Sequence, residues 1–342
     1  MRVSELGEFG LIERIARFLP TPPSDVVVGI GDDVAVLRTS GPDYLLATCD
    51  AQVENVHFIR QSISPYQLGR KIAAINVSDI AAKGGAPAWA LVSLALPTDI
   101  EVSFVDELYK GMQEQIEKAG AAIVGGNLSK IREELMIDLF LLGKVAPKEL
   151  VLRSGAREGD LVLVTGTLGD SRAGLELLRR TPALTVSEAS RLQVEARHLT
   201  PQPRLAEGQL LARCGMVHAM ADVSDGLAGD LNHICRASDV GAEIQWANVP
   251  VSAPCEEVAR AAGHDGRQWA LTGGEDYELL FTTDPDAASE IQKMLAQETG
   301  TQAHVIGRIL PKSSGILITL PSGERVPCSS GTMGWDHFSA TT

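Results

Sequence analysis

Short runs rich in β-branched and aliphatic residues alternate with longer amphipathic runs along almost the whole chain. Strand-like runs include 26–30, 44–49 and 88–96, and the longer helix-like runs include 65–83 and 102–118. Glycine and proline separate these runs, and the same alternation resumes after residue 160. Such an alternation predicts stacked layers of helices and mixed sheets, which is the α/β class.

The length of the chain predicts two domains. With 342 residues and 44% hydrophobic content, the chain exceeds what one hydrophobic core usually accommodates. The segment 147–160 separates two alternating halves and is the predicted boundary, which gives domains at 1–147 and 148–342. We therefore expect a cleft between two domains.

Composition excludes several classes of function. The net charge of −14 and an aromatic content of 4% disfavour a nucleic-acid partner, which would require a basic face or stacking platforms. Acidic residues interrupt the N-terminal apolar positions and no run is long enough to span a membrane, so we expect neither a leader nor a membrane partner. The five cysteines are scattered and lack a Cys-x-x-Cys spacing, which predicts no disulfide and no zinc site. These features favour a cytoplasmic location.

Acidic residues gather at the ends of strand-like runs and in helix-like segments, often beside glycine. Asp32, Asp33 and Asp50 adjoin strand-like runs, Asp79 lies in the helix-like run 65–83, Asp222 and Asp225 open a helix, and Glu275 and Asp276 follow two glycines. Neighbouring carboxylates repel one another unless a cation neutralises them, and adjacent glycines allow the backbone to approach a ligand. Because no histidine or thiolate accompanies these acids, they favour magnesium or manganese over zinc. A phosphate-binding Gly-x-x-x-x-Gly-Lys loop is absent from the sequence.

Each acidic segment also has a structural alternative. Asp222 before Ser224 and Asp225 could cap a helix. Asp32-Asp33 could lie in a hairpin turn, and 273–276 could be a loop before a strand. Taken singly, none of these segments establishes a site.

Taken together and in order, the segments resemble the thiamine-monophosphate kinase family, whose superfamily includes aminoimidazole ribonucleotide synthetase and selenophosphate synthetase. The matching segments are Gly7-Glu8-Phe9, 29–33, 50–58, 76–82, Arg153 to Ala156, 164–171, 222–227, 273–279 and Trp335 to Phe338. The resemblance implies a two-domain aminoimidazole ribonucleotide synthetase-like fold, with an N-terminal sheet domain that forms a homodimer and a C-terminal α/β domain. It also implies transfer of the γ-phosphoryl group of ATP to thiamine monophosphate with several magnesium ions.

The resemblance assigns roles to individual positions. The implied metal ligands are Asp33, Thr48, Cys49, Asp50, Asp79, Asn127, Asp222 and Asp225, of which Asp33, Asp50, Asp79 and Asp222 are also the catalytic group. The implied ATP contacts are Tyr109, Gly126, Asn127, Arg153 and Ser224. The implied contacts to thiamine phosphate are His57, Glu275 and Trp335, a set in which a carboxylate and an aromatic ring suit a cationic thiazolium. His57 could instead be a satisfied strand histidine, and Trp335 could be a packing residue.

The sequence departs from the family pattern at two positions. Asn127 follows Gly125-Gly126 where many members have aspartate, and Cys49 stands where threonine is common. An asparagine keeps a ligand oxygen but loses the charge that strengthens magnesium binding, or it could serve only to stabilise a turn. A nucleotide-binding dimer without catalysis is therefore the rival hypothesis. A selenophosphate synthetase would need a reactive cysteine or selenocysteine beside a lysine near a glycine-rich N-terminus, and this sequence has none there.

Overall fold

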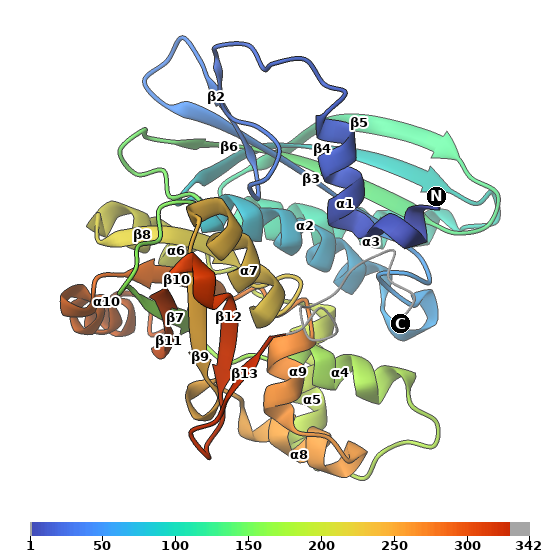
Figure 1. The fold of residues 1–342 in the computed structure, drawn as a ribbon. Helices are drawn as coiled ribbons and strands as arrows, with labels where there is room; N and C mark the ends of the chain where they lie inside the picture. Colours follow the sequence, from blue (N-terminus) through green and yellow to red (C-terminus); the bar gives the residue numbers. More distant parts are fainter. Residues whose placement is uncertain (1, 329–342) are drawn as a thin grey trace.

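The first half of the molecule is a six-stranded sheet with two long helices on one face. The computed structural model describes residues 2–328, so Trp335 lies outside the described part. The strands run in the order β1-β2-β3-β6-β4-β5, with only the β4–β5 pair parallel. Their bounds are β1 Val26–Val28, β2 Ala35–Arg38, β3 Tyr44–Val53, β4 Ala86–Leu96, β5 Ala122–Lys130 and β6 Met136–Val145. Helices α2 (Pro65–Ala82) and α3 (Val102–Lys118) pack beneath this sheet (Figure 1).

Helix α2 is the element that joins the two halves. It begins at a capping box: Ser64 Oγ accepts from the backbone N–H of Gln67, and the Gln67 side chain accepts from the backbone N–H of Ser64. Most of its residues are buried, because one side packs on the sheet and α3 while the other meets the second half. One such contact is the hydrogen bond from Ser78 Oγ to Asp222 Oδ2, at 2.7 Å.

The second half is a seven-stranded mixed sheet with helices around it. The strand order is β13-β12-β9-β11-β7-β10-β8. The strands are β7 Leu161–Thr165, β8 Val217–Asp222, β9 Gly241–Gln245, β10 Leu279–Thr283, β11 Ala303–Leu310, β12 Ile316–Thr319 and β13 Arg325–Pro327. The helices are α4 Asp170–Arg179, α5 Glu188–Leu199, α6 Leu205–Cys214, α7 Leu227–Ser238, α8 Ala253–Ala262, α9 Gly266–Thr272 and α10 Pro285–Glu298. These two sheets confirm the predicted class, whereas the boundary at 147/148 stays a prediction.

The N-terminal helix α1 (Val3–Ala16) crosses from the first half to the second. Gly7 interrupts it with φ of 71°, a left-handed conformation that favours glycine. Its Phe9 ring packs against His233 of α7, with ring centroids 4.6 Å apart. α1 therefore lies beside α7 of the second half.

All five cysteines are free thiols in the structure. Between residues 2 and 328, no helix combines the length and apolar character needed to cross a bilayer.

Candidate active site

Three carboxylates from distant parts of the sequence meet where the two halves touch. Asp33 comes from the loop between β1 and β2, Asp79 from α2, and Asp222 from the end of β8. One oxygen of each can be chosen so that all three lie within 4.8 Å of one another. The hairpin-turn alternative for Asp33 is correct as a description of the backbone, because β1 and β2 are antiparallel neighbours. That turn also delivers the carboxylate to the group.

Neighbouring hydroxyl groups orient two of these carboxylates. Thr48 Oγ1 donates to Asp79 Oδ2 at 2.5 Å, and Ser78 Oγ donates to Asp222 Oδ2. Asp50 stands two residues beyond Thr48 on β3, and its charge raises the pKa of Asp79. The structure thus places four predicted catalytic aspartates and Thr48 at one site.

The electrostatics of this group favour a bound cation. Burial and then the charge of Asp33 raise the pKa of Asp222 to about 7. Burial and then the charge of Asp50 raise the pKa of Asp79 well above its usual range. Asp222 Oδ1 is buried and has no hydrogen-bond partner within the described part of the chain. An all-oxygen group with surplus negative charge and an unsatisfied buried oxygen fits magnesium.

The raised pKa of Asp222 predicts how pH changes the stability of the metal-free protein. The folded pKa of about 7 exceeds the ordinary 3.8, so the folded state holds this proton more tightly than the unfolded state. The resulting stability is present at low pH and is lost as the pH rises through 7. Between pH 6 and 8 this group alone removes about 1 kcal/mol from the free energy of unfolding in EDTA.

Asp222→Asn isolates this contribution, because the amide oxygen can still accept from Ser78 but carries no charge. We expect urea unfolding in EDTA to show a smaller loss between pH 6 and 8 for the variant than for the wild type. Equal losses in the two proteins would show that Asp222 ionises normally in the folded state.

Two cations neutralise Asp33. Burial alone would raise the pKa of Asp33, but Arg153 and Lys83 lower it below its ordinary value. The Arg153 guanidinium contacts Asp33 Oδ1, and Lys83 Nζ lies 2.6 Å from Asp33 Oδ2. Sequence reasoning singled out Arg153 but missed Lys83. The available signal was a lysine directly after the apolar helix 65–82 and before two glycines.

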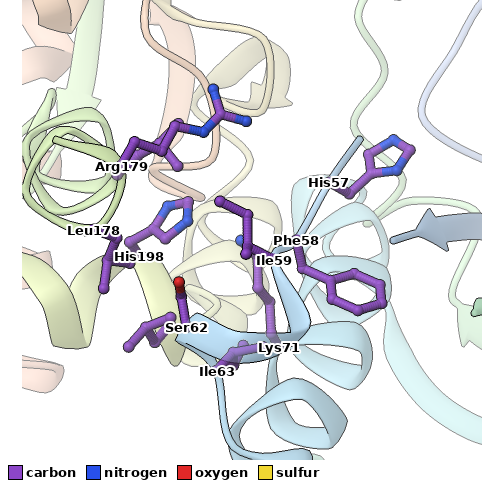
Figure 2. Close-up of a pocket in the computed structure, with 11 residues that line it drawn as sticks. His57, Phe58, Ile59, Ser62, Ile63, Lys71, Leu178, Arg179 and His198 are labelled. Carbon is purple, nitrogen blue, oxygen red and sulfur yellow. The ribbon is translucent and has the colours of Figure 1, made fainter. Parts of the chain in front are cut away.

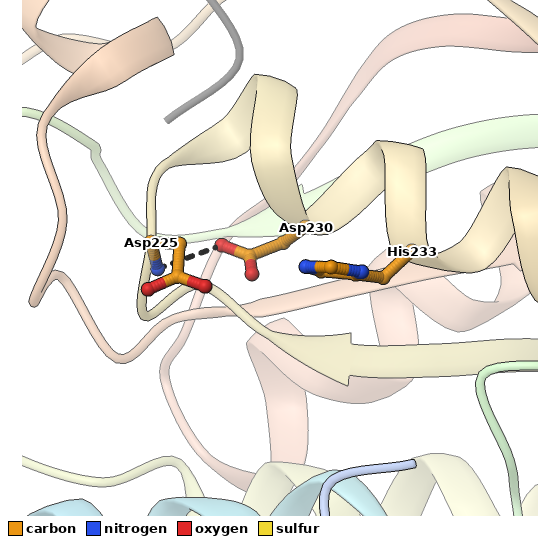
Figure 3. Close-up of side chains that lie close together, drawn as sticks. All are labelled: Asp225, Asp230 and His233. Atoms are coloured by element: carbon orange, nitrogen blue, oxygen red, sulfur yellow. Dashed lines mark hydrogen bonds between the residues drawn. The ribbon is translucent and has the colours of Figure 1, made fainter. Parts of the chain in front are cut away.

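A second acidic group forms at the start of α7. Asp225, Asp230 and His233 offer ligand atoms within 4.8 Å of one another, with Asp230 between the other two in Figure 3. Asp230 Oδ2 accepts from the backbone N–H groups of Ser224 and Asp225, each at 3.1 Å. Burial and the charge of Glu8 raise the pKa of Asp225 to about 7. The sequence pattern did not indicate a role for Asp230. Its carboxylate fixes the loop that carries Ser224 and Asp225.

This loop also decides between the two hypotheses for Asp222. Helix α7 begins after Gly226, which has no side chain to cap it, and Asp222 ends strand β8. Asp222 is therefore not a helix cap, and the side chain that binds the loop's N–H groups is Asp230.

Glu275 lies in a third cluster with cationic neighbours. Its carboxylate is 2.9 Å from Lys71 Nζ and 3.3 Å from His198 Nδ1. Burial alone would raise the pKa of Glu275, but the Lys71 ammonium lowers it overall, with smaller effects from His198 and His57. Glu275 has φ of 66°, which is uncommon for a non-glycine residue and is typical of strained functional loops. The loop-before-strand alternative is correct here, since residues 273–278 precede β10.

A small cavity adjoins this cluster. In Figure 2, Lys71 lies between His57 on one side and Arg179 and His198 on the other. Burial and the charge of Lys71 lower the pKa of His198 to about 3, so its imidazole is neutral. Its Nδ1 forms a hydrogen bond with Ser171 Oγ at 3.0 Å. His57 Nδ1 accepts a hydrogen bond from the backbone N–H of Val53. This bond agrees with the alternative in which His57 is satisfied by the fold. The structure nevertheless brings His57 to the cavity beside Glu275.

Two predicted metal ligands lie on the other face of the six-stranded sheet. Residues paired across neighbouring strands share a face of the sheet, and successive residues along a strand alternate between faces. Asn127 therefore shares a face with its partner Ser93, with Asp138, which pairs with Ser93, and with Ala51, which pairs with Asp138. Cys49 is two residues from Ala51 and lies on this face, whereas Asp50 pairs with the buried Leu139 on the opposite face. The side chains of Cys49 and Asn127 therefore point away from Asp50, and within one chain the structure does not bring them to the aspartate group.

The remaining predicted ATP contacts have packing roles within the chain. Tyr109 on α3 packs against the core of the first half. A side chain at Gly126 would place its Cβ 1.9 Å from the carbonyl oxygen of Val92, so close packing of β5 on β4 requires glycine there. Their ATP contacts stay predictions.

Two protein-family models match this chain, one in each half of the molecule. The family model for the N-terminal domain of AIR synthase related proteins matches residues 31–145, and the model for the C-terminal domain matches 157–319. The thiamine-monophosphate kinase of Aquifex aeolicus is 39% identical over 99% of this chain and 100% of its own length. That of Synechococcus elongatus is 36% identical over 98% of both chains.

Solved structures show the same relationship. AaThiL complexed with AMPPCP and TMP is 38% identical, has a TM-score of 0.84, and is matched over 98% of this chain and 99% of that one. The HypE–HypF complex, at 18% identity and a TM-score of 0.71, shares the fold alone. Because full-length relatives exceed 30% identity and both family models match, this chain belongs to the thiamine-monophosphate kinase family of AIR synthase related proteins.

Proposed function

We propose that this protein phosphorylates thiamine monophosphate to thiamine diphosphate, using ATP and several magnesium ions. The observation that carries the proposal is the convergence of Asp33, Asp79 and Asp222 from three separate elements. It is supported by family membership and by the relative solved with AMPPCP and TMP.

The aspartate group would hold magnesium, with Asp50 and Thr48 beside it. Magnesium supplies neutralisation of the charge that develops on a transferring phosphoryl group. Asp225, in the second acidic group, would hold a further ion close to Ser224. Arg153, whose guanidinium is paired with Asp33, is placed to add bidentate contacts to phosphate oxygens.

The cluster around Glu275 would bind the thiamine phosphate. Glu275 is ionised and half-buried, which suits a cationic thiazolium ring. His57 and the cationic Lys71 and Arg179 line the adjoining cavity and would contribute to binding an anionic group. Trp335 is a proposed ring partner that lies outside the described residues.

Direct transfer needs no general base, because the attacking atom is an oxygen of an already ionised phosphate. Incubation of purified protein with ATP, magnesium and thiamine monophosphate, followed by chromatography for thiamine diphosphate, tests the proposal. Formation of ADP without thiamine diphosphate would instead support a nucleotide-binding protein without this kinase activity. We also expect the protein to act in the cytoplasm.

We further propose that a second copy covers the outer face of the six-stranded sheet. Trp89, Leu91 and Phe140 are 39%, 42% and 42% exposed, and Leu91 pairs directly with Phe140 on this face. Exposed apolar patches of this kind are typical of interaction sites, and β5 also presents an open sheet edge. Asn127 shares this face, so a metal-binding role for it requires the second copy.

Leu91→Asp is expected to convert a dimer into a monomer, because it would bury a charge in the interface. Sedimentation velocity measures the change. Leu192→Asp is the matched control, since Leu192 is also exposed (59%) but lies on α5 in the second half. A wild-type monomer, or dissociation by both substitutions, would contradict the proposed interface.

A further inference from the structure

Lys83, which directly follows the last residue of helix α2, has a completely buried side chain. Its Nζ lies 2.6 Å from Asp32 Oδ1 and 2.6 Å from Asp33 Oδ2. It also donates to the carbonyl oxygen of Met220 at 3.0 Å. The ammonium group thus uses all three of its donors on oxygen atoms.

We propose that Lys83 is a built-in cation of the active site, which positions Asp33 and supplies charge that a divalent ion would otherwise supply. A lysine ammonium is a compact point charge, and here it sits among three oxygens as a hard cation would. Desolvation of an ammonium group is costly unless it is fully paired, and the two carboxylates provide that pairing.

The contacts of Lys83 also join the two halves at the site. Asp32 and Asp33 belong to the first half, whereas Met220 lies on β8 of the second half, two residues before Asp222. Asp32 Oδ2 additionally accepts from the backbone N–H of Arg153. Lys83 is therefore a positioning residue, because it fixes the Asp33 carboxylate relative to Asp222 before metal or nucleotide binds.

Loss of Lys83 would leave Asp33 paired with the Arg153 guanidinium and Asp32 with the backbone N–H of Arg153 in the described structure. The freed oxygens of Asp32, Asp33 and Met220 would then form a place for a divalent ion. A variant without the ammonium should therefore bind more metal and depend on it for stability.

Lys83→Met tests this inference, because methionine is flexible and unbranched but uncharged. In EDTA, we expect the Tm of the variant to lie about 10 °C below that of the wild type. Saturating magnesium should restore most of that loss, while it raises the wild-type Tm less. Electron paramagnetic resonance with manganese should count more bound ions per chain in the variant.

Lys71→Met is the matched control, since Lys71 is the other buried lysine of α2 and pairs with Glu275. We expect it to lose Tm in EDTA without recovery in magnesium and without an additional manganese ion. Lys83→Arg keeps the charge and should keep the wild-type manganese count, whatever its Tm.

An equal manganese count in wild type and Lys83→Met, or equal magnesium effects on both methionine variants, would overturn the inference. Failure of Lys83→Met to fold even in magnesium would overturn it as well, because the metal would then not replace the ammonium. The inference rests on the proposed magnesium use, but these readouts do not require turnover. A wild type that binds manganese and does not phosphorylate thiamine monophosphate would contradict the proposed function alone.

Discussion

Asp79→Ala and Asp222→Ala are each expected to lower kcat by at least about 1000-fold in a thiamine diphosphate assay. Each substitution removes a carboxylate from the group where Asp33, Asp79 and Asp222 meet. Charge neutralisation by the bound metal is the main catalytic contribution in the proposed transfer, so loss of a ligand should act chiefly on kcat. The assay is run at saturating ATP, thiamine monophosphate and magnesium.

Thermal and urea unfolding of the same variants separate chemistry from stability. The carboxylates repel one another in the metal-free fold, so removing one should change the free energy of unfolding by no more than about 1 kcal/mol. Removing a carboxylate relieves repulsion and so stabilises the fold, whereas loss of its hydrogen bond to Thr48 or Ser78 destabilises it. A large loss of stability with kcat retained would show that the acids serve the fold and not the reaction.

The elements of the first half were predictable because local sequence and tertiary packing agree there. The helix expected at 102–118 is α3, and that expected at 65–83 ends one residue earlier, at Ala82. Gly125-Gly126 indicates the end of a strand, but β5 continues to Lys130, because pairing with β4 carries it through the glycines. The apolar positions Leu11, Ile12, Ile15 and Leu19 predict a helix over 8–19, whereas α1 spans Val3–Ala16 with an interruption at Gly7.

The second half contains elements that periodicity did not reveal. Strand β9 includes Glu243, whose buried carboxylate is paired with Arg308 of the adjacent β11 and with Arg325 of β13, two strands away. An acidic residue in a short segment indicates an exposed loop, because the arginines that pair with it are distant in sequence. Helices α8 and α10 begin at serine or aspartate caps with proline in the first turn, a local signal that indicates a helix start without any apolar periodicity.

The site was predictable in its acids and in Arg153, but not in its two buried lysines. Glycine-flanked aspartates at strand ends can be found from order along the chain, whereas Lys71 and Lys83 lie in an apolar helix and at its end. Their roles depend on Glu275 and Asp33, which are distant in sequence. Likewise, the alternation that places Asn127 and Asp50 on opposite faces depends on strand register, which the sequence does not specify by itself.

The preference for the phosphorylated acceptor is also expected to be large. The kcat/KM for thiamine monophosphate should exceed that for free thiamine by at least about 1000-fold. A free hydroxyl must lose its proton as it attacks, whereas a phosphate oxygen is already ionised. In the proposed site the aspartates would be engaged as magnesium ligands, and the groups beside them are held in ion pairs or are weak bases. Asp33 is held by Arg153 and Lys83, Glu275 is paired with Lys71, and His198, with its pKa of about 3, is a weak base.

Chromatographic detection of thiamine monophosphate and diphosphate, with each acceptor at matched concentrations, measures this ratio. The control is ATP hydrolysis without acceptor, which corrects for phosphate transfer to water. Comparable phosphorylation of free thiamine would mean that one of these groups acts as a base after all, and that the direct phosphate-to-phosphate transfer is wrong. His198 would then be the first residue to test, because its imidazole is neutral and its Nδ1 lies 3.3 Å from Glu275.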